Sequence, residues 1–239
     1  MSTDNYVVKT LVTTEMIRRI ADSYGVRTIG DLPVGFKWIG GTVEQAGAEL
    51  FALGCEESHG YMVGEYARDK DGVVACLLMA EMTAKLKARG RSLHEKLDDL
   101  FWQHGVHAER LLTLRMEGSE GMSRMQELMS AFRESPPQQW GGIELAAVRD
   151  YLNSCIIKND QSCALDGPVT NLIIMDLAEQ GNYVAVRPSG TEPKIKFYMF
   201  GYTPPEQLAD LNDAKLELQN RLDRIEEEIQ ETVSGPLTH

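Results

Sequence analysis

The chain has 239 residues, 43% of them hydrophobic, and a formal net charge of −12. This length and apolar content suffice for one large core or two ordinary ones. An acidic surface does not attract the phosphate backbone of nucleic acids, and no apolar run has the length of a signal peptide or a membrane span. We therefore expect a cytoplasmic protein without nucleic-acid or membrane partners, which captures any anion through a local cluster of cations.

Cysteine and histidine spacing points to no metal centre. The four cysteines are Cys55, Cys76, Cys155 and Cys163, and they form no Cys-x-x-Cys pair, which favours reduced thiols. The five histidines show no zinc-type spacing. We identify no metal ligands in the chain.

Over residues 1–105, strand-like segments alternate with segments of helical periodicity. We expect strands at 6–13, 26–29 and 51–55 and helices at 15–24, 39–45, 72–89 and 92–104. Thr14, Asp71 and Ser92 precede three of these helices and are expected to cap them. This alternation predicts an α/β domain of three-layer type.

After Gly105 the pattern changes to one of strands with few helices. We expect strands at 107–115, 143–151, 170–178, 182–186 and 195–200, helices at 119–132 and 204–232, and an irregular exposed segment at 153–167. This pattern predicts an α+β domain with a mainly antiparallel sheet. The predicted domains are therefore 1–105 and 106–239.

The terminal helix carries one narrow apolar stripe. Its members are Leu208, Leu211, Leu218, Leu222, Ile225 and Ile229. Two interpretations remain open: the stripe packs on the sheet of its own domain, or it forms a dimer seam.

Residues 187–194 read Arg-Pro-Ser-Gly-Thr-Glu-Pro-Lys and join two strand-like segments. The outgoing strand is expected to place Ile195 and Phe197 on one face and Lys196 on the other. A guanidinium, two hydroxyls and an unshielded glycine N–H are the groups that bind phosphate, and Pro188 stiffens the turn. Composition alone favours a phosphate site and a solvated surface hairpin equally.

This string resembles the phosphate-binding loop of the α-D-phosphohexomutases, the phosphoglucomutase and phosphomannomutase superfamily. The resemblance implies that Arg187, Ser189, Gly190 and Thr191 contact the phosphate of a substrate. Lys196, on the outgoing strand, is an additional phosphate-binding residue by the same resemblance.

Residues 54–61, Gly-Cys-Glu-Glu-Ser-His-Gly-Tyr, resemble the sugar-binding loop of that family. The resemblance implies that Glu56 and Ser58 bind sugar hydroxyls, to which a carboxylate and a hydroxyl are suited. Glu57 is expected to face the protein. The alternative for the tripeptide alone is an acidic loop that caps a helix. Residues 35–40 resemble the family segment whose basic residue reaches the active cleft, which implies a catalytic role for Lys37.

Two family motifs have no counterpart in this sequence: the serine loop Thr-Ala-Ser-His-Asn-Pro and the metal loop Asp-x-Asp-x-Asp-Arg. The resemblance thus implies the third and fourth domains, the C-terminal half, of a mutase that interconverts hexose 1-phosphate and hexose 6-phosphate. The phosphoserine and the ligands of Mg²⁺ would lie in N-terminal domains outside this chain, and a hexose bisphosphate would be the intermediate and activator.

We therefore expect the chain by itself to be inactive, with a phosphosugar and the missing N-terminal domains as its partners. The alternative is a stand-alone, non-catalytic phosphosugar-binding module. Glucose, mannose, glucosamine and pentose phosphates are not distinguished by these motifs.

Overall fold

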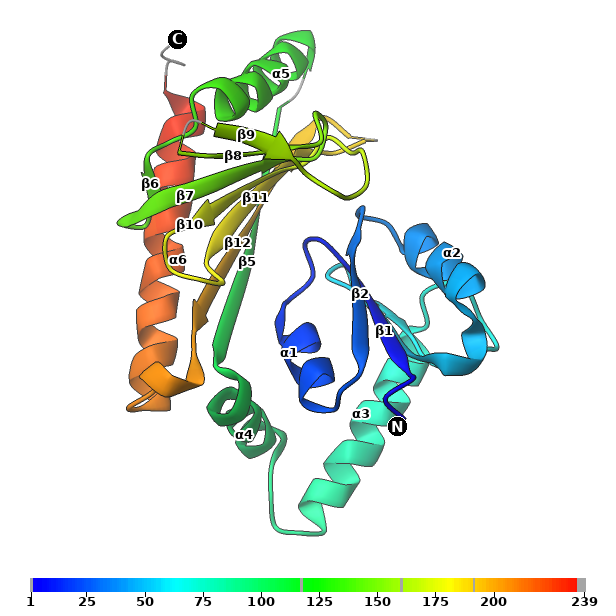
Figure 1. The fold of residues 1–239 in the computed structure, drawn as a ribbon. Coiled ribbons are helices and arrows are strands. Elements are labelled where there is room, and N and C mark those ends of the chain that lie inside the picture. Colours follow the sequence, from blue (N-terminus) through cyan, green and yellow to red (C-terminus); the bar gives the residue numbers. More distant parts are fainter. Residues whose placement is uncertain (1, 117, 160, 191, 236–239) are drawn as a thin grey trace. The chain divides into compact units, whose positions relative to one another are not determined.

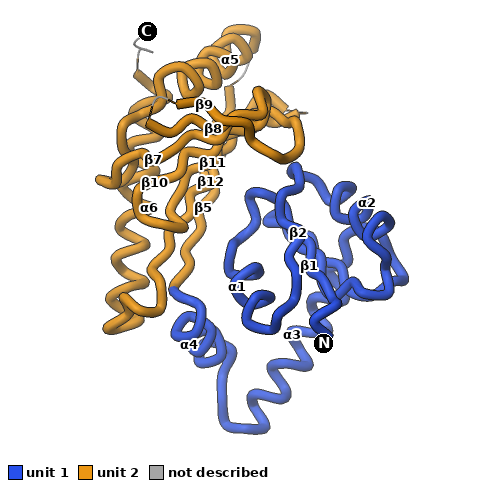
Figure 2. Tube along the Cα trace, viewed as in Figure 1, with its two compact units in different colours: residues 1–105 blue, residues 106–239 orange. Residues whose placement is uncertain are grey.

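A computed structural model describes residues 2–116, 118–159, 161–190 and 192–235. The chain divides into two compact units, Met1–Gly105 and Val106–His239 (Figure 2). Each unit has a sheet of its own. Among the described helices, none combines the length and apolar character needed to cross a membrane.

Unit 1 is an α/β layer built on a four-stranded sheet of order β2-β1-β3-β4 (Figure 1). Its elements are β1 (Tyr6–Thr10), α1 (Met16–Ser23), β2 (Arg27–Leu32), α2 (Phe36–Ala46), the 3₁₀ turn η1 (Ala48–Leu50), β3 (Phe51–Glu56), β4 (Gly60–Met62), α3 (Gly72–Lys87) and α4 (Leu93–His104). β1 runs parallel to both of its neighbours, β2 and β3, whereas β4 returns antiparallel to β3. The central strand β1 is buried along its whole length.

Helices cover both faces of this sheet. Tyr6 and Val8 of β1 pack with Ile39 of α2 on one face. Val7, the residue between them, packs with Ala21 of α1 on the other face. The period of two along β1 therefore separates two helix layers, and the predicted α/β class is confirmed.

Two of the three predicted helix caps are confirmed. The Asp71 side chain accepts hydrogen bonds from the amides of Val73 and Val74 at the start of α3. Ser92 forms a capping box with Glu95 at the start of α4. The Thr14 hydroxyl accepts a hydrogen bond from the amide of Met16, the first residue of α1, at 3.2 Å, although the N-cap position itself falls on Glu15, which makes no capping bond.

Unit 2 is an α+β layer with an eight-stranded sheet in which every strand pairing is antiparallel. Its elements are β5 (Val106–Arg115), α5 (Gly118–Glu134), β6 (Gln139–Trp140), β7 (Ile143–Asp150), β8 (Cys155–Lys158), β9 (Gln161–Ala164), β10 (Ile173–Leu177), β11 (Tyr183–Pro188), β12 (Lys194–Thr203), η2 (Pro205–Gln207) and α6 (Leu211–Ser234). The strand order is β5-β12-β11-β10-β7-β8-β9, with β6 paired to β7. The predicted mainly antiparallel sheet is confirmed.

One core joins both helices of unit 2 to one face of its sheet. Phe197 of β12, which is fully buried, packs edge-on against Phe132 of α5 with ring centroids 5.8 Å apart. Leu222 and Ile225 of α6 belong to the same core. The apolar stripe of α6 is thus buried within its own unit, which is the intramolecular alternative for that stripe.

Two predicted segments are corrected. Residues 153–167 are not irregular, because they contain the hairpin β8–β9 at the edge of the sheet. All four residues of β9 are exposed, so this strand has no apolar alternation by which it could be recognised. The last helix begins at Leu211 instead of 204, because residues 205–207 form a 3₁₀ turn and Asp210 caps the helix.

Candidate phosphate and sugar loops

The turn between β11 and β12 is closed by its backbone. The amide of Ser189 donates to the carbonyl of Lys194 at 2.8 Å. The antiparallel register places Arg187 of β11 directly opposite Lys196 of β12. Since Ile195 faces the helix-covered core, both cations lie on the opposite face of the sheet.

Arg187 makes one long side-chain contact among the residues that the structure describes. Its Nη1 donates to the hydroxyl of Tyr198 at 3.4 Å, and the residue is half-buried. Gly190 is exposed, and a Cβ built on it would meet no atom within 4 Å. A ligand can therefore approach the backbone of this turn closely. Thr191 lies outside the described residues.

The carboxylate of Glu192, in the same turn, forms an ion pair with a neighbouring lysine. Lys194 Nζ lies 2.5 Å from Glu192 Oε2. The hydrogen bond from Lys194 lowers the pKa of the Glu192 carboxyl, and the charges of Lys194, Arg115 and Lys196 lower it further. Arg115 ends β5 directly opposite Lys194. The local field at this turn is therefore cationic, although the whole chain is acidic.

The turn between β3 and β4 holds the second predicted loop. Glu56 ends β3 opposite Gly60 of β4, and only 4% of its surface is exposed. A Cβ on Gly60 would lie 2.5 Å from Glu56 Cγ, so glycine is needed there. His59 in the turn has φ 55°, a left-handed conformation that is uncommon for residues other than glycine.

The two oxygens of Glu56 differ. Oε1 lies 2.5 Å from Lys70 Nζ, whereas Oε2 is buried and has no hydrogen-bond partner among the described residues. Lys70 Nζ also donates to the carbonyl of Ser58 at 3.0 Å, so one ammonium joins the Glu56 carboxylate to the backbone in the middle of the turn. A buried carboxylate oxygen without a donor is costly.

The start of α2, the helix that carries Lys37, lies beside this loop. Phe36 begins α2, and its ring lies 2.7 Å from a Cβ built on Gly60. The next residue, Lys37, is exposed, with Nζ 5.1 Å from the centroid of the Trp38 ring. The fold of unit 1 thus brings the start of α2 to the turn that carries Glu56.

The predicted site residues fall into two sets, one in each unit. Unit 1 holds Lys37, Glu56 and Ser58, whereas unit 2 holds Arg187, Ser189, Gly190 and Lys196. Sequence reasoning missed Lys70 and Arg115. Lys70 precedes a helix cap within a charged stretch, and Arg115 reaches the turn only through strand register, so neither belongs to a local motif.

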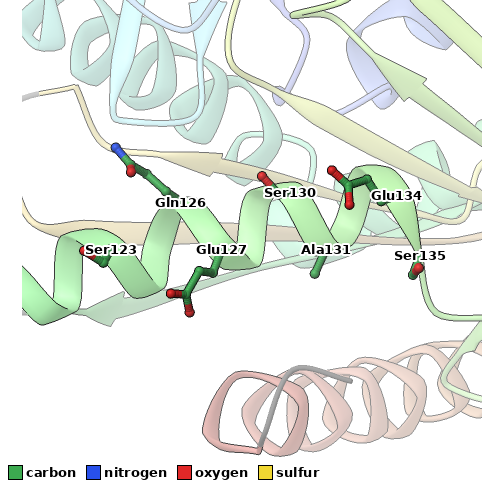
Figure 3. Close-up of a pocket in the computed structure, with 7 residues that line it drawn as sticks. All are labelled: Ser123, Gln126, Glu127, Ser130, Ala131, Glu134 and Ser135. Carbon is green, nitrogen blue, oxygen red and sulfur yellow. The ribbon is translucent and has the colours of Figure 1, made fainter. Parts of the chain in front are cut away.

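A separate groove of about 390 Å³ runs along α5 (Figure 3). Its lining comes from α5 and the residue after it: Ser123, Gln126, Glu127, Ser130, Ala131, Glu134 and Ser135. This lining contains two carboxylates and no lysine or arginine, so the groove is unsuited to phosphate. Within the described ranges, no group of three or more His, Cys, Asp or Glu side chains could hold a metal ion.

Two models of one protein family match the chain, one in each unit. Residues 1–104 match the family model for phosphoglucomutase/phosphomannomutase, alpha/beta/alpha domain III, and residues 144–218 match the model for the C-terminal domain of the same family. The open-form structure of the Paramecium phosphoglucomutase parafusin superposes on 90% of the chain and 37% of its own length, with a TM-score of 0.59 and 20% identity. A family protein from Burkholderia thailandensis superposes on 98% of the chain and 39% of its own length, with a TM-score of 0.50 and 12% identity. These structures show a shared fold.

A sequence relative extends the match. Phosphoglucomutase of Staphylococcus aureus strain MRSA252 is 32% identical over 198 residues, which cover 81% of this chain and 35% of the relative. The chain belongs to the phosphoglucomutase/phosphomannomutase family and carries its domain III and C-terminal domain. It spans about a third of the length of the curated relatives it matches.

Proposed function

We propose that the chain is the substrate-binding part of a phosphoglucomutase/phosphomannomutase, an enzyme that interconverts hexose 1-phosphate and hexose 6-phosphate. One observation carries this proposal: in a chain of this family, the open turn after β11 sets Arg187 opposite Lys196 on a sheet face away from the core. Guanidinium and ammonium groups beside free backbone amides bind a phosphate group.

In this proposal the two loops bind different parts of the substrate. Arg187, Ser189, Gly190, Thr191 and Lys196 bind the phosphate that does not react. The Glu56 carboxylate accepts hydrogen bonds from sugar hydroxyls, and the Ser58 hydroxyl donates or accepts them. Lys37 supplies a positive charge or a proton near the reacting oxygen.

The phosphoryl group itself is handled by a phosphoserine outside this chain. That serine gives its phosphoryl group to the sugar phosphate, and the resulting bisphosphate returns its other phosphoryl group to the serine. We propose that the ligands of Mg²⁺ lie, like that serine, in N-terminal domains outside this chain, as the family resemblance implies.

We expect no mutase turnover by this chain alone with glucose 1-phosphate and magnesium, because phosphoryl transfer requires an acceptor group and charge neutralisation that these residues do not provide. Formation of glucose 6-phosphate, followed by ³¹P NMR, is the measurement. Isomerisation above background in a preparation free of host mutase would contradict the prediction. Coding sequence for the serine and aspartate loops, upstream or in a neighbouring gene, would favour the enzyme over a stand-alone binding module.

Glu56→Gln is expected to weaken glucose 6-phosphate binding and leave inorganic phosphate binding unchanged. The substitution keeps the shape of the side chain but removes a charged acceptor, a loss of about 1–3 kcal/mol or roughly 5- to 150-fold in affinity. Calorimetric titration of the 239-residue chain with each ligand measures both effects. Glu57→Gln is the matched control. If Glu57→Gln lowered sugar phosphate affinity and Glu56→Gln did not, the assignment would be reversed.

A further inference from the structure

Four cations lie together on one face of three adjacent strands in unit 2. The ladder between β11 and β12 sets Arg187 opposite Lys196, and the ladder between β12 and β5 sets Arg115 opposite Lys194. Directly paired residues point to the same face of a sheet, and so do residues two apart on one strand. Figure 1 shows β5, β12 and β11 side by side.

This arrangement is unfavourable without an anion. Like charges directly opposite each other on neighbouring strands destabilise a sheet. Two such pairs, Arg187 with Lys196 and Arg115 with Lys194, lie next to each other here. Glu192 forms an ion pair with Lys194 at 2.5 Å. Within the described ranges, no ion pair is found for Arg115, Lys196 or Arg187. The cluster therefore carries a positive charge that its own carboxylate does not balance.

A backbone hydrogen bond next to Arg115 also joins the end of β5 to the turn between β11 and β12. The amide of Met116, the next residue, donates to the carbonyl of Pro193 at 2.8 Å. This bond holds the end of β5 against the segment between Gly190 and Lys194. The Arg115 side chain is exposed, so its donors remain open to a ligand at the turn.

We propose that Arg115 is a further phosphate-binding residue, which supplies a second guanidinium to the site formed by Arg187 and Lys196. The inference rests on the proposed phosphate site and extends it to a strand outside the loop motif. Arg115 lies within residues 105–143, which neither family model covers. A phosphate monoester carries a charge of about −1.5 to −2 and three acceptor oxygens, and two guanidiniums with one ammonium match that charge and donor demand.

The test is calorimetric titration of the full chain with inorganic phosphate. We expect Arg115→Gln to weaken binding about 3- to 10-fold, because an exposed charged donor contributes less than a buried one. Arg115→Lys should recover most of the affinity. The matched control is Lys158→Gln, which removes the same charge from β8 of the same sheet and should change affinity less than about 2-fold because distant charges are screened.

Thermal unfolding separates binding from folding. Since Arg115→Gln removes a like-charge pair, the variant without phosphate should melt no lower than the parent chain. Added phosphate should raise its melting temperature less than it raises that of the parent. Lowered stability without phosphate would make Arg115 a structural residue and overturn the inference.

The remaining outcomes distinguish two failures. If Arg187→Ala weakens phosphate binding while Arg115→Gln behaves like Lys158→Gln, the inference is wrong and the proposed phosphate site stands. If the parent chain binds no phosphate, both are wrong.

Discussion

Glu15→Ala is expected to destabilise unit 1 by up to about 3 kcal/mol, because it removes the partly exposed partner of Lys9 and leaves a buried charge uncompensated. Lys9, in the central strand β1, is fully buried. Its Nζ lies 2.7 Å from Glu15 Oε1 and donates to the carbonyls of Thr10 and Thr13 at 3.1 and 2.9 Å. Burial lowers the pKa of Lys9, which limits the cost because the side chain can lose its proton.

Hydrogen exchange at the β1 amides measures this effect within unit 1, since a chain of two units need not unfold in one step. The double variant Lys9→Met/Glu15→Ala should lose less stability than the sum of its two single variants, because no buried charge remains. Strictly additive losses would show that the pair does not couple.

The ion pair between Lys9 and Glu15 also predicts that the stability of unit 1 decreases at acidic pH. Burial alone would raise the pKa of Glu15, but the charge and hydrogen bond of Lys9, with those of Arg18, hold it below the usual value of 4.5. A folded pKa below the unfolded one contributes stability above the unfolded pKa, and this is lost as the pH falls through the folded pKa. Protection of β1 should therefore decrease below about pH 4.5, and Glu15→Gln should not show this step.

Features set by local chemistry could be predicted from the sequence. Asp71 and Ser92 start helices through bonds to amides two or three residues away, and the alternation of Ile195 and Lys196 follows from strand geometry alone. The hairpin β8–β9 could not be recognised, because its outer strand is stabilised by backbone bonds to one neighbour while its side chains are exposed.

Partners distant in sequence could not be predicted either. Lys70 meets Glu56 only because the segment after β4 folds back over the turn. Arg115 meets Lys194 through a ladder between residues 79 positions apart, whose register depends on the packing of the whole sheet. Local motifs therefore predict the two loops, whereas the charged partners of those loops depend on how distant segments pack and cannot be predicted from the motifs.

Arg187→Ala is expected to weaken phosphate binding about 10- to 100-fold, since a hydrogen bond to a charged group contributes about 1.5–3 kcal/mol. Three features favour a dominant role for Arg187. Its guanidinium can engage two phosphate oxygens at once, it is half-buried, and its contact with Tyr198 is long at 3.4 Å. Little existing bonding is therefore given up when phosphate binds.

Calorimetric titration with inorganic phosphate compares this variant with two others. Ser189→Ala removes a neutral hydroxyl and should cost about 2- to 10-fold, or 0.5–1.5 kcal/mol. Tyr198→Phe removes the long contact to Arg187 and should change affinity less than about 2-fold, because a bond at 3.4 Å is weak. Equal losses for Arg187→Ala and Ser189→Ala would mean that the backbone amides around Gly190 hold the phosphate and that the guanidinium contributes no more than a neutral donor.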